Sequence, residues 1–325
     1  MVVVAGQFLY DVTDPVHPIL ICRGENTYLR LLGGNAIGYT TVVTGTVTVA
    51  VRRDLTTGAV TRIGDLRMNP QPYYYAAASW TSDGLFEVYA TTSSASANGL
   101  WKVQVHLWAY GADHVLYTID AGPGGLESRW AAHSTLEFSP DHTYVAVSDS
   151  NFSLLAKNVR IFSLADQHQV FVTATSAFGG TWTADDRFIW ATGSGLVMQW
   201  TRSGGATAFR SERWFGPTSS QGGQWMAATL LTDANSPRVV LVATNGGRTV
   251  ITGPGSSPGF VSSSKVWYAE EAPCPSNDQC GADTTAPTRI VRAYDVNDGS
   301  DQVVVFRAGE EPGLNGFLFC CSPRT

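Results

Sequence analysis

The stretch from Phe138 to Leu164 indicates the architecture of the whole chain. It reads FSPDHTYVAVSDS over residues 138–150 and NVRIFSL over residues 158–164. Asp141 stands in a short polar turn, where an Asp side chain can bond the backbone two residues further on. The flanking runs are rich in Val, Ile, Tyr and Phe, which favour strands. This stretch therefore predicts consecutive β-strands joined by short turns.

The same rhythm recurs along the chain. Seven hairpin-like stretches lie about 40 to 55 residues apart, which is the period of a four-stranded propeller blade. They start at Phe8, Val47, Val105, Val159, Val197, Val239 and Ile290. Between them lies a second element, a strand, an Asp- or Gly-bearing turn and another strand, as in AASWTSDGLFEVYATT and GGTWTADDRFIWATG. The hairpin and the second element each contribute two strands to a repeat. The sequence therefore predicts an all-β chain that folds as one β-propeller domain over residues 1–325.

The repeats predict seven four-stranded blades. Six can be drawn between Asn26 and Phe306. We expect N-terminal strands within residues 2–22 and a C-terminal strand at 316–321 to share the closing blade, because such an exchange protects sheet edges. Six or eight blades would require one misassigned hairpin. The alternative fold is a two-sheet β-sandwich, which the regular period disfavours.

The stretch at 138–164 also carries a resemblance to a known group. FSPDHTYVAVSDS followed by NVRIFSL resembles a blade of the TolB-like and WD-repeat propellers, whose usual turn reads Ser-Pro-Asp-Gly. His142 stands where Gly is usual, and Phe162-Ser163 stands where a WD blade has Trp-Asp. The resemblance implies a binding or scaffold propeller that works outside the bacterial cytoplasm or as an ectodomain.

The composition excludes several classes of function. Only 15% of the residues are charged, and the formal net charge is −6, whereas a nucleic-acid binder needs a basic surface. The 44% hydrophobic content argues against disorder. No apolar run approaches the ~18 residues of a membrane span. We expect a monomer without a cofactor.

Two similar tetrapeptides, residues 127–130 (ESRW) and residues 211–214 (SERW), give the candidate binding site. Each is predicted to precede the innermost strand of a blade, and each combines an acid, an Arg that can hold an anion and a Trp that offers a flat ring. Tyr74 enters another innermost strand and is a further candidate. The candidate ligand-binding residues are Glu127, Arg129, Trp130, Glu212, Arg213, Trp214 and Tyr74. In the alternative interpretation these aromatic side chains pack between blades.

The sequence favours a non-catalytic propeller that recognises a protein segment or a glycan on its loop face. The alternative is a propeller enzyme, a lyase or a glycoside hydrolase, with paired carboxylates at the channel mouth. Glu127 and Glu212 are the first pair to consider for it. No metal site is expected, because the Asp-rich turn at 295–301 lacks the terminal Glu of an EF-hand.

The five cysteines bear on the compartment. Cys274 and Cys280 lie at the two ends of the turn-rich loop CPSNDQC and are predicted to form a disulfide. A disulfide of this kind indicates an oxidising, extracytoplasmic compartment. Cys320 and Cys321 are adjacent, and either a vicinal disulfide or two free thiols is compatible with the sequence.

Overall fold

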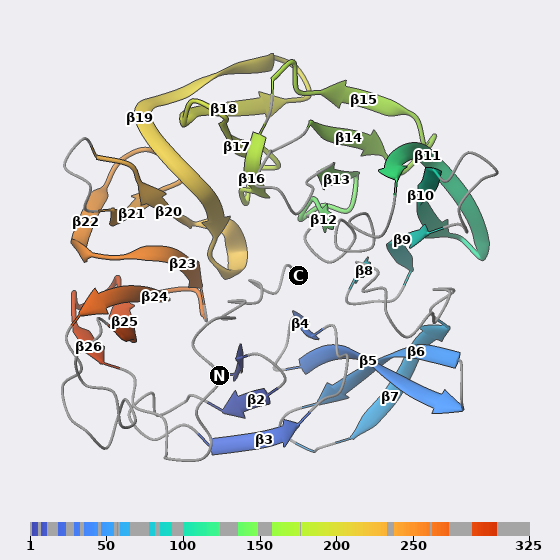
Figure 1. Ribbon diagram of the computed structural model, residues 1–325, viewed down its shortest axis with the longest axis horizontal. Helices are drawn as coiled ribbons and strands as arrows, with labels where there is room; N and C mark the ends of the chain where they lie inside the picture. The colour runs from blue at the N-terminus through green and yellow to red at the C-terminus, as the bar shows by residue number, and fades with distance from the viewer. Residues whose placement is uncertain are drawn as a thin grey trace.

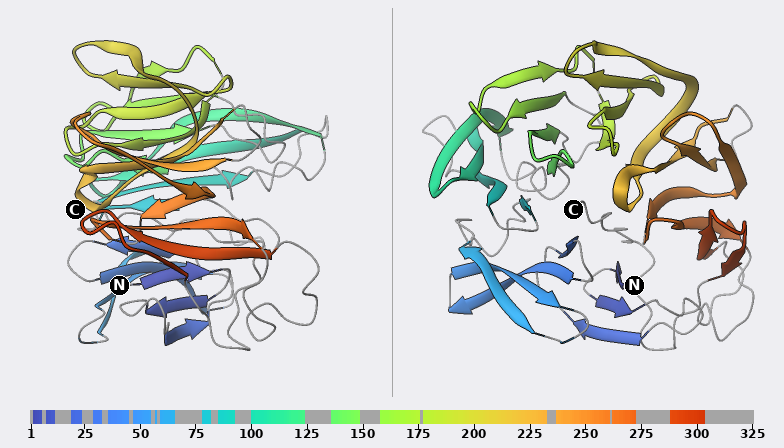
Figure 2. Two further views of the ribbon diagram at one scale, coloured as in Figure 1. Left: turned by 90° about the vertical axis from the view of Figure 1, so that its left-hand side faces the viewer. Right: turned by 180° about the vertical axis from the view of Figure 1, so that it is seen from behind.

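The described strands lie in sheets that follow one another around a common centre (Figure 1). Figure 2 shows the same arrangement from the side and from behind. This computed structural model describes residues 2–5, 8–11, 19–23, 29–32, 36–44, 47–54, 57, 59–65, 78–81, 85–92, 100–123, 136–148, 158–175, 177–232, 237–260, 262–272 and 288–303.

The first half of the chain forms a three-stranded sheet followed by three four-stranded sheets, all antiparallel. The three-stranded sheet contains β1 (Val2–Ala5), β2 (Phe8–Asp11) and β3 (Ile19–Arg23). The next contains β4 (Leu29–Leu32), β5 (Ala36–Thr44), β6 (Val47–Asp54) and β7 (Val60–Asp65). Then come β8 (Ala78–Trp80), β9 (Phe86–Thr92), β10 (Leu100–Ala109) and β11 (Ala112–Pro123). The last of these sheets contains β12 (Leu136–Phe138), β13 (Tyr144–Ser148), β14 (Val159–Ser163) and β15 (Gln169–Val172).

The second half forms a seven-stranded and a four-stranded sheet. The larger one contains β16 (Ala177–Trp182), β17 (Phe188–Thr192), β18 (Leu196–Thr201), β19 (Gly205–Ser219), β20 (Trp225–Leu230), β21 (Arg238–Ala243) and β22 (Thr249–Pro254). The 3-10 helix η1 (Gln221–Gly223) follows β19. The smaller one contains β23 (Ser256–Phe260), β24 (Lys265–Ala272), β25 (Thr288–Asp295) and β26 (Asp301–Val303).

The seven-stranded sheet consists of two sets of four strands, β16–β19 and β19–β22, which share strand β19. Each of the other sheets forms one set. Residues 205–213 of β19 pair with β18, and its residues 214–219 pair with β20. The strand therefore runs as the outermost strand of one set and continues toward the centre as the innermost strand of the next (Figure 1).

The predicted hairpins are confirmed at all seven places. They are the antiparallel pairs β2–β3, β6–β7, β10–β11, β14–β15, β18–β19, β21–β22 and β25–β26. The two intervening elements quoted above form the pairs β8–β9 and β16–β17. The expected strand at 316–321 lies outside the described residues.

A hydroxyl group closes the turn between the two innermost strands of five sets. In each, the Oγ atom of a Ser or Thr accepts a hydrogen bond from a backbone N–H three to five residues further on. These residues are Thr81, Ser139, Thr183, Ser220 and Ser262. The recurring Ser or Thr is therefore a local device of the repeat, and it explains why a short polar segment separates each pair of apolar runs.

The core lies between the sheets rather than inside any one of them. Along β13, Tyr144 and Ala146 pack toward β16–β18, whereas Val145 and Val147 pack toward β9 and β10. Neighbouring side chains of a strand point to opposite faces, so β13 is buried on both sides. The same stacking joins β17 and β18 to β20 and β21, and these in turn to β23 and β24. Burial of both faces leaves few strand positions for charged residues.

Two innermost strands approach each other closely at bulges. The bulge in β16 falls at Gly179 and that in β19 at Gly216-Pro217. Both glycines have positive φ, and a Cβ on Gly179 would lie 3.3 Å from the Gly216 Cα. The buried hydroxyls of Thr181 and Ser219 lie 2.9 Å apart between the same two strands.

Candidate functional site

The strand order gives each stacked sheet two distinct ends. Because neighbouring strands are antiparallel, the first-to-second and third-to-fourth turns of each set lie at one end, here called the turn end. The turns between the second and third strands lie at the other end of the sheet, here called the crossover end. The connections from the last strand of one set to the first strand of the next set lie there too. Residues 211–214 lie at the crossover end, beside the turn at 192–195, since the Trp214 N–H donates to the Gly195 carbonyl.

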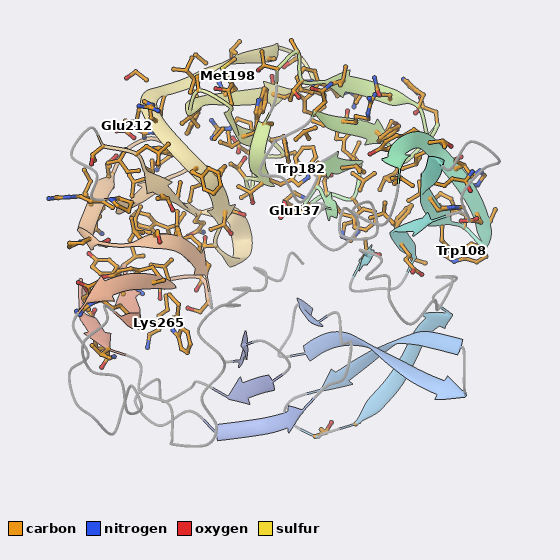
Figure 3. All side chains as sticks on the ribbon, in the orientation of Figure 1. Trp108, Glu137, Trp182, Met198, Glu212 and Lys265 are labelled. Atoms are coloured by element: carbon orange, nitrogen blue, oxygen red, sulfur yellow. The ribbon has the colours of Figure 1, made fainter. Side chains whose placement is uncertain are left out.

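Trp214 is a core residue. Only 1% of its surface is exposed, and it packs with Ile189, Val197 and Met226 between two sets of strands. Its Nε1 donates to Oε2 of Glu212 over 3.0 Å. The packing alternative is therefore the arrangement found at Trp214, and Glu212 serves as the partner of its indole. Figure 3 shows Glu212 toward the outside of the ring, whereas Glu137 of β12 lies nearer the centre.

The opposite side of β19 faces solvent. Arg213 is exposed, and its Nε donates to the Ser194 carbonyl over 3.2 Å. Phe215 is 40% exposed, and Leu196, which pairs with Arg213 across the two strands, is 48% exposed. A cation and two apolar side chains are thus presented together at the crossover end. Sequence reasoning missed Phe215, although strand alternation places it on the same side as Arg213.

The remaining predicted site residues lie outside the described part of the chain. They are Tyr74, Glu127, Arg129 and Trp130, together with Cys274 and Cys280. Three expectations therefore stay predictions. They are that Arg129-Trp130 and Arg213-Trp214 lie at one mouth, that Glu127 and Glu212 form a carboxylate pair, and that Cys274 and Cys280 form a disulfide.

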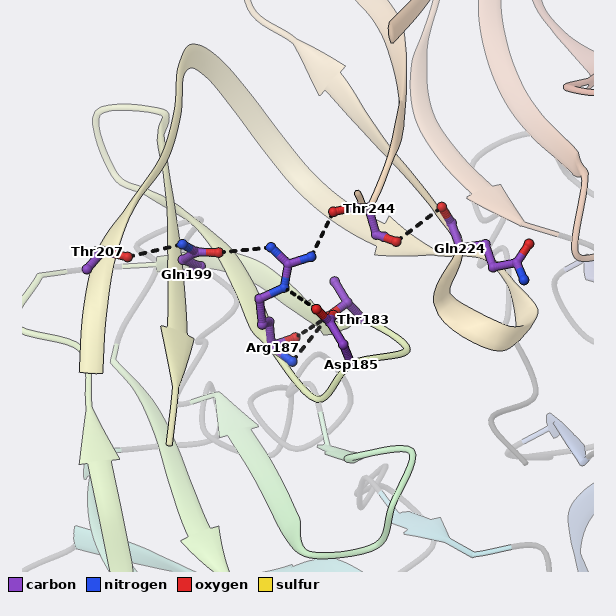
Figure 4. Close-up of polar contacts among 7 residues, drawn as sticks. All are labelled: Thr183, Asp185, Arg187, Gln199, Thr207, Gln224 and Thr244. Carbon is purple, nitrogen blue, oxygen red and sulfur yellow. Dashed lines mark hydrogen bonds and ion pairs between the residues drawn. The ribbon is translucent and has the colours of Figure 1, made fainter. Parts of the chain in front are cut away.

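The turn end carries a polar network centred on Arg187 (Figure 4). Its Nε forms an ion pair with Asp185 at 2.9 Å, and its Nη2 donates to the Thr244 carbonyl at 2.7 Å. Its Nη1 donates to the Gln199 Oε1 at 3.2 Å. Since Thr244 follows β21, Arg187 joins the turn of one set of strands to its neighbour. The pKa of Asp185 lies below its ordinary value, because hydrogen bonds from Thr183 and Arg187 and the charge of Arg187 outweigh desolvation.

Two aspartates lie close together at the turn end, Asp141 in the turn between β12 and β13 and Asp186 in the turn between β16 and β17. The Asp141 N–H donates to the Asp186 Oδ1 over 3.3 Å. Burial raises the pKa of Asp186, and the negative charge of Asp141 raises it further. Burial also acts on Asp141, but hydrogen bonds from Ser139 and Thr143 outweigh it and lower the pKa of Asp141.

A third polar cluster ties the last strands together. The Tyr268 hydroxyl donates to Oδ2 of Asp301 over 2.8 Å, and Arg292 contacts the Asp301 Oδ1 at 3.0 Å and the Glu270 Oε2 at 3.3 Å. Burial and the neighbouring Asp301 raise the pKa of Tyr268 well above its ordinary value. One guanidinium therefore compensates both carboxylates, which makes this cluster a link between β24, β25 and β26.

A metal-binding cluster and a nucleophile elbow are two features that many enzymes use. The described residues hold no group of three or more His, Cys, Asp and Glu side chains able to bind a metal ion. The pentapeptide Gly255–Gly259 has the spelling Gly-x-Ser-x-Gly, but it runs into strand β23 and is followed by β24. A nucleophile elbow requires a turn from a strand into a helix. Within the described ranges, no helix has the length and hydrophobicity to span a bilayer.

Comparison with known proteins identifies the fold class. No protein-family model and no curated protein sequence matches the chain. Among solved structures, it is similar to a puromycin-hydrolyzing peptidase from Mycobacterium tuberculosis, with a TM-score of 0.58 and 12% identity over 95% of this chain and 54% of the peptidase. An acylaminoacyl peptidase from Pyrococcus horikoshii gives a TM-score of 0.54 and 10% identity over 93% of this chain and 48% of that one.

TolB from Acinetobacter baumannii is also similar, with a TM-score of 0.48 and 16% identity over 86% of this chain and 66% of TolB. The stacked sheets and the two peptidases together define an all-β propeller, as the sequence predicts. At such low identities the likeness shows the fold alone. The chain spans about half the length of the two peptidases.

Proposed function

We propose that this chain is a non-catalytic binding propeller of seven four-stranded blades, which recognises a protein segment or a glycan at its crossover end. The observation that carries the proposal is the exposed group formed by Arg213, Phe215 and Leu196. An exposed aromatic ring beside an arginine is a common composition of binding hot spots. The proposal keeps the location that the sequence predicts for the binding site, and it names Phe215 instead of Trp214 as the contacting ring.

Alternate residues of β19 are proposed to have different roles, one pair in holding the strand and the other in contacting the ligand. Glu212 and Trp214 hold the crossover in place from inside through their hydrogen bond. Arg213 and Phe215 alternate with them and face solvent. The rigid inner pair fixes the position of the outer pair, which lowers the entropic cost of binding. Arg129, Trp130 and Tyr74 are proposed to supply further contacts from neighbouring blades, with Glu127 beside them.

The test is a screen of the full chain on a glycan array and on a peptide array. The double variant Arg213→Ser/Phe215→Ser should lose binding about tenfold or more to each ligand found. Arg202→Ser and Ile251→Ser are matched controls, because both residues are exposed and lie away from residues 213–215. Equal binding by the double variant and the wild-type chain would refute the crossover site.

The proposed extracytoplasmic location rests on the predicted disulfide. Mass spectrometry of the purified chain after alkylation, with and without a reductant, should show that Cys274 and Cys280 are linked. Both cysteines alkylated before reduction would contradict the disulfide and remove this argument for an oxidising compartment. Sedimentation of the same sample tests the expected monomer.

A further inference from the structure

Left-handed backbone at non-glycine residues is confined to the turn end in the described part of the chain. It occurs at Tyr110, His142, Gln167 and Asp186. Each lies in a first-to-second or a third-to-fourth turn, and together they span three consecutive sets of strands. Glycine adopts this conformation at no steric cost, so each of these turns carries a side chain at a position that local structure does not favour.

Tyr110 is the clearest case. Tyr110 and Gly111 form the two-residue turn between β10 and β11, and their φ values are 52° and 82°. A turn with positive φ at both positions strongly prefers Asn-Gly. A bulky ring at the first position is strained, and its side chain is 74% exposed, so burial offers little compensation.

Leu85, Tyr110 and the half-buried His142 lie around the Phe86 side chain and are here called the Tyr110 patch. The Phe86 ring lies beneath it, at 5.3 Å from Tyr110 and 6.4 Å from His142 between ring centroids. Leu85, next to Phe86, is 56% exposed. The buried Phe86 side chain thus provides a firm base for two rings that come from different sets of strands.

The patch borders on negative charge. Asp141 precedes His142 directly, and its N–H contacts the Asp186 carboxylate. Within the residues described, no lysine or arginine lies at ion-pair distance from either Asp141 or Asp186. Their mutual repulsion contributes to the raised pKa of Asp186. A cation that arrived from outside would be attracted by both carboxylates.

We propose that the turn end is a second interaction surface, at which the Tyr110 patch and the Asp141–Asp186 pair bind a protein segment that places a lysine or arginine beside an apolar side chain. The cationic head would lie against the two carboxylates, and the apolar side chain would cover Tyr110 and Leu85. This surface lies at the opposite end of the strands from the crossover site, so it does not depend on the function proposed above.

The experiment starts from a library of random short peptides displayed on phage and selected on the immobilised full chain. Selected peptides are then resynthesised and titrated against wild-type protein and variants. The peptides should share a lysine or arginine close to an apolar residue. Tyr110→Asn should weaken their binding about tenfold or more. The double variant Asp141→Asn/Asp186→Asn should do the same and should remove most of the dependence on salt.

Tyr110→Asn separates binding from folding. Asn suits the left-handed position, so this variant should unfold at an equal or higher temperature than the wild-type chain while it loses the peptide. Ile251→Asn and Asp298→Asn are the matched controls, because both residues are exposed and lie away from the patch. They should leave affinity unchanged.

Several results would overturn the inference. No enriched peptide, or enriched peptides without a cation, would exclude the partner proposed. Peptides that respond to Phe215→Asn but not to Tyr110→Asn would place binding at the crossover end and support only the function proposed above. Self-association lost in Tyr110→Asn, measured by sedimentation, would identify a second copy of this chain as the occupant. Glycan binding lost in that variant would identify a sugar.

Discussion

Asp141 and Asp186 are neighbours in space, but their pKa values are shifted in opposite directions. Asp141 accepts hydrogen bonds from Ser139 and Thr143, which favour its charged form. Asp186 accepts one from the Asp141 N–H and is otherwise partly desolvated next to a like charge. The two substitutions to Asn are therefore expected to change stability in opposite directions.

We expect Asp186→Asn to raise the free energy of unfolding at pH 7, by up to about 1 kcal/mol. The raised folded-state pKa means that the wild-type Asp186 is most favourable below the unfolded pKa, near 3.9, and loses this contribution as the pH rises through the folded pKa. The gain of the variant should therefore vanish in acid. Urea unfolding between pH 3 and pH 7 measures it.

Asp141→Asn serves as the opposite case. The lowered pKa of Asp141 means that its contribution is present above the unfolded pKa and is lost as the pH falls through the folded pKa. This variant should be less stable than the wild-type chain at pH 7 and equal to it in acid. A loss of stability in both variants at pH 7 would contradict the assignment of Asp186.

Trp214 and Phe215 differ in burial although they are adjacent. Trp214→Ala should lower the free energy of unfolding by about 3 to 5 kcal/mol, because it opens a cavity between two sheets and removes the partner of Glu212. Phe215→Ala should cost less than about 1 kcal/mol. Chemical denaturation of both variants checks this, and similar losses for the two would argue against the burial pattern.

At the scale of the element, turns of neighbouring sets of strands pack on one another. Gly222 and Gly223 are adjacent, and both have positive φ. A Cβ on Gly223 would lie 2.3 Å from the Ala184 backbone nitrogen, whereas a Cβ on Gly222 would meet nothing within 4 Å. Only Gly223 is therefore required for the close approach of these turns.

Alanine at each position isolates this contact. Gly222→Ala introduces only the backbone strain, about 1 kcal/mol. Gly223→Ala adds a clash with backbone that cannot move easily, so we expect a loss at least about 2 kcal/mol larger. Thermal unfolding of the two variants measures the difference, and equal midpoints would show that the turns do not touch.

At the scale of the whole molecule, the sheet of β1, β2 and β3 has three described strands where its neighbours have four. The sequence predicts that residues 316–321 supply the fourth. In hydrogen–deuterium exchange, this segment should then be protected in the folded chain as strongly as β2. Exchange as fast as in a synthetic peptide of the same sequence would contradict the predicted closure of the ring.

The rhythm of strands and turns could be predicted because it is local. Alternating apolar residues, Asp- and Gly-bearing turns and the spacing of the repeat led to seven hairpins that the structure contains. The continuous apolar runs, such as Val239–Val242, follow from burial on both faces. The low charge of 15% has the same cause. These signals depend only on neighbours along the chain, so they can be recognised from the sequence without knowledge of the fold.

The placement of the candidate site depended on distant neighbours. Sequence reasoning chose Trp214 as a contacting ring, because it could not tell which side of β19 the next sheet would cover. It also could not place Asp141 beside Asp186, which is 45 positions away. The sequence by itself determined the strands, the turns and the stacked repeat. Only the tertiary structure decided which aromatic ring is buried and which carboxylates meet, because both depend on the contact between separate sheets.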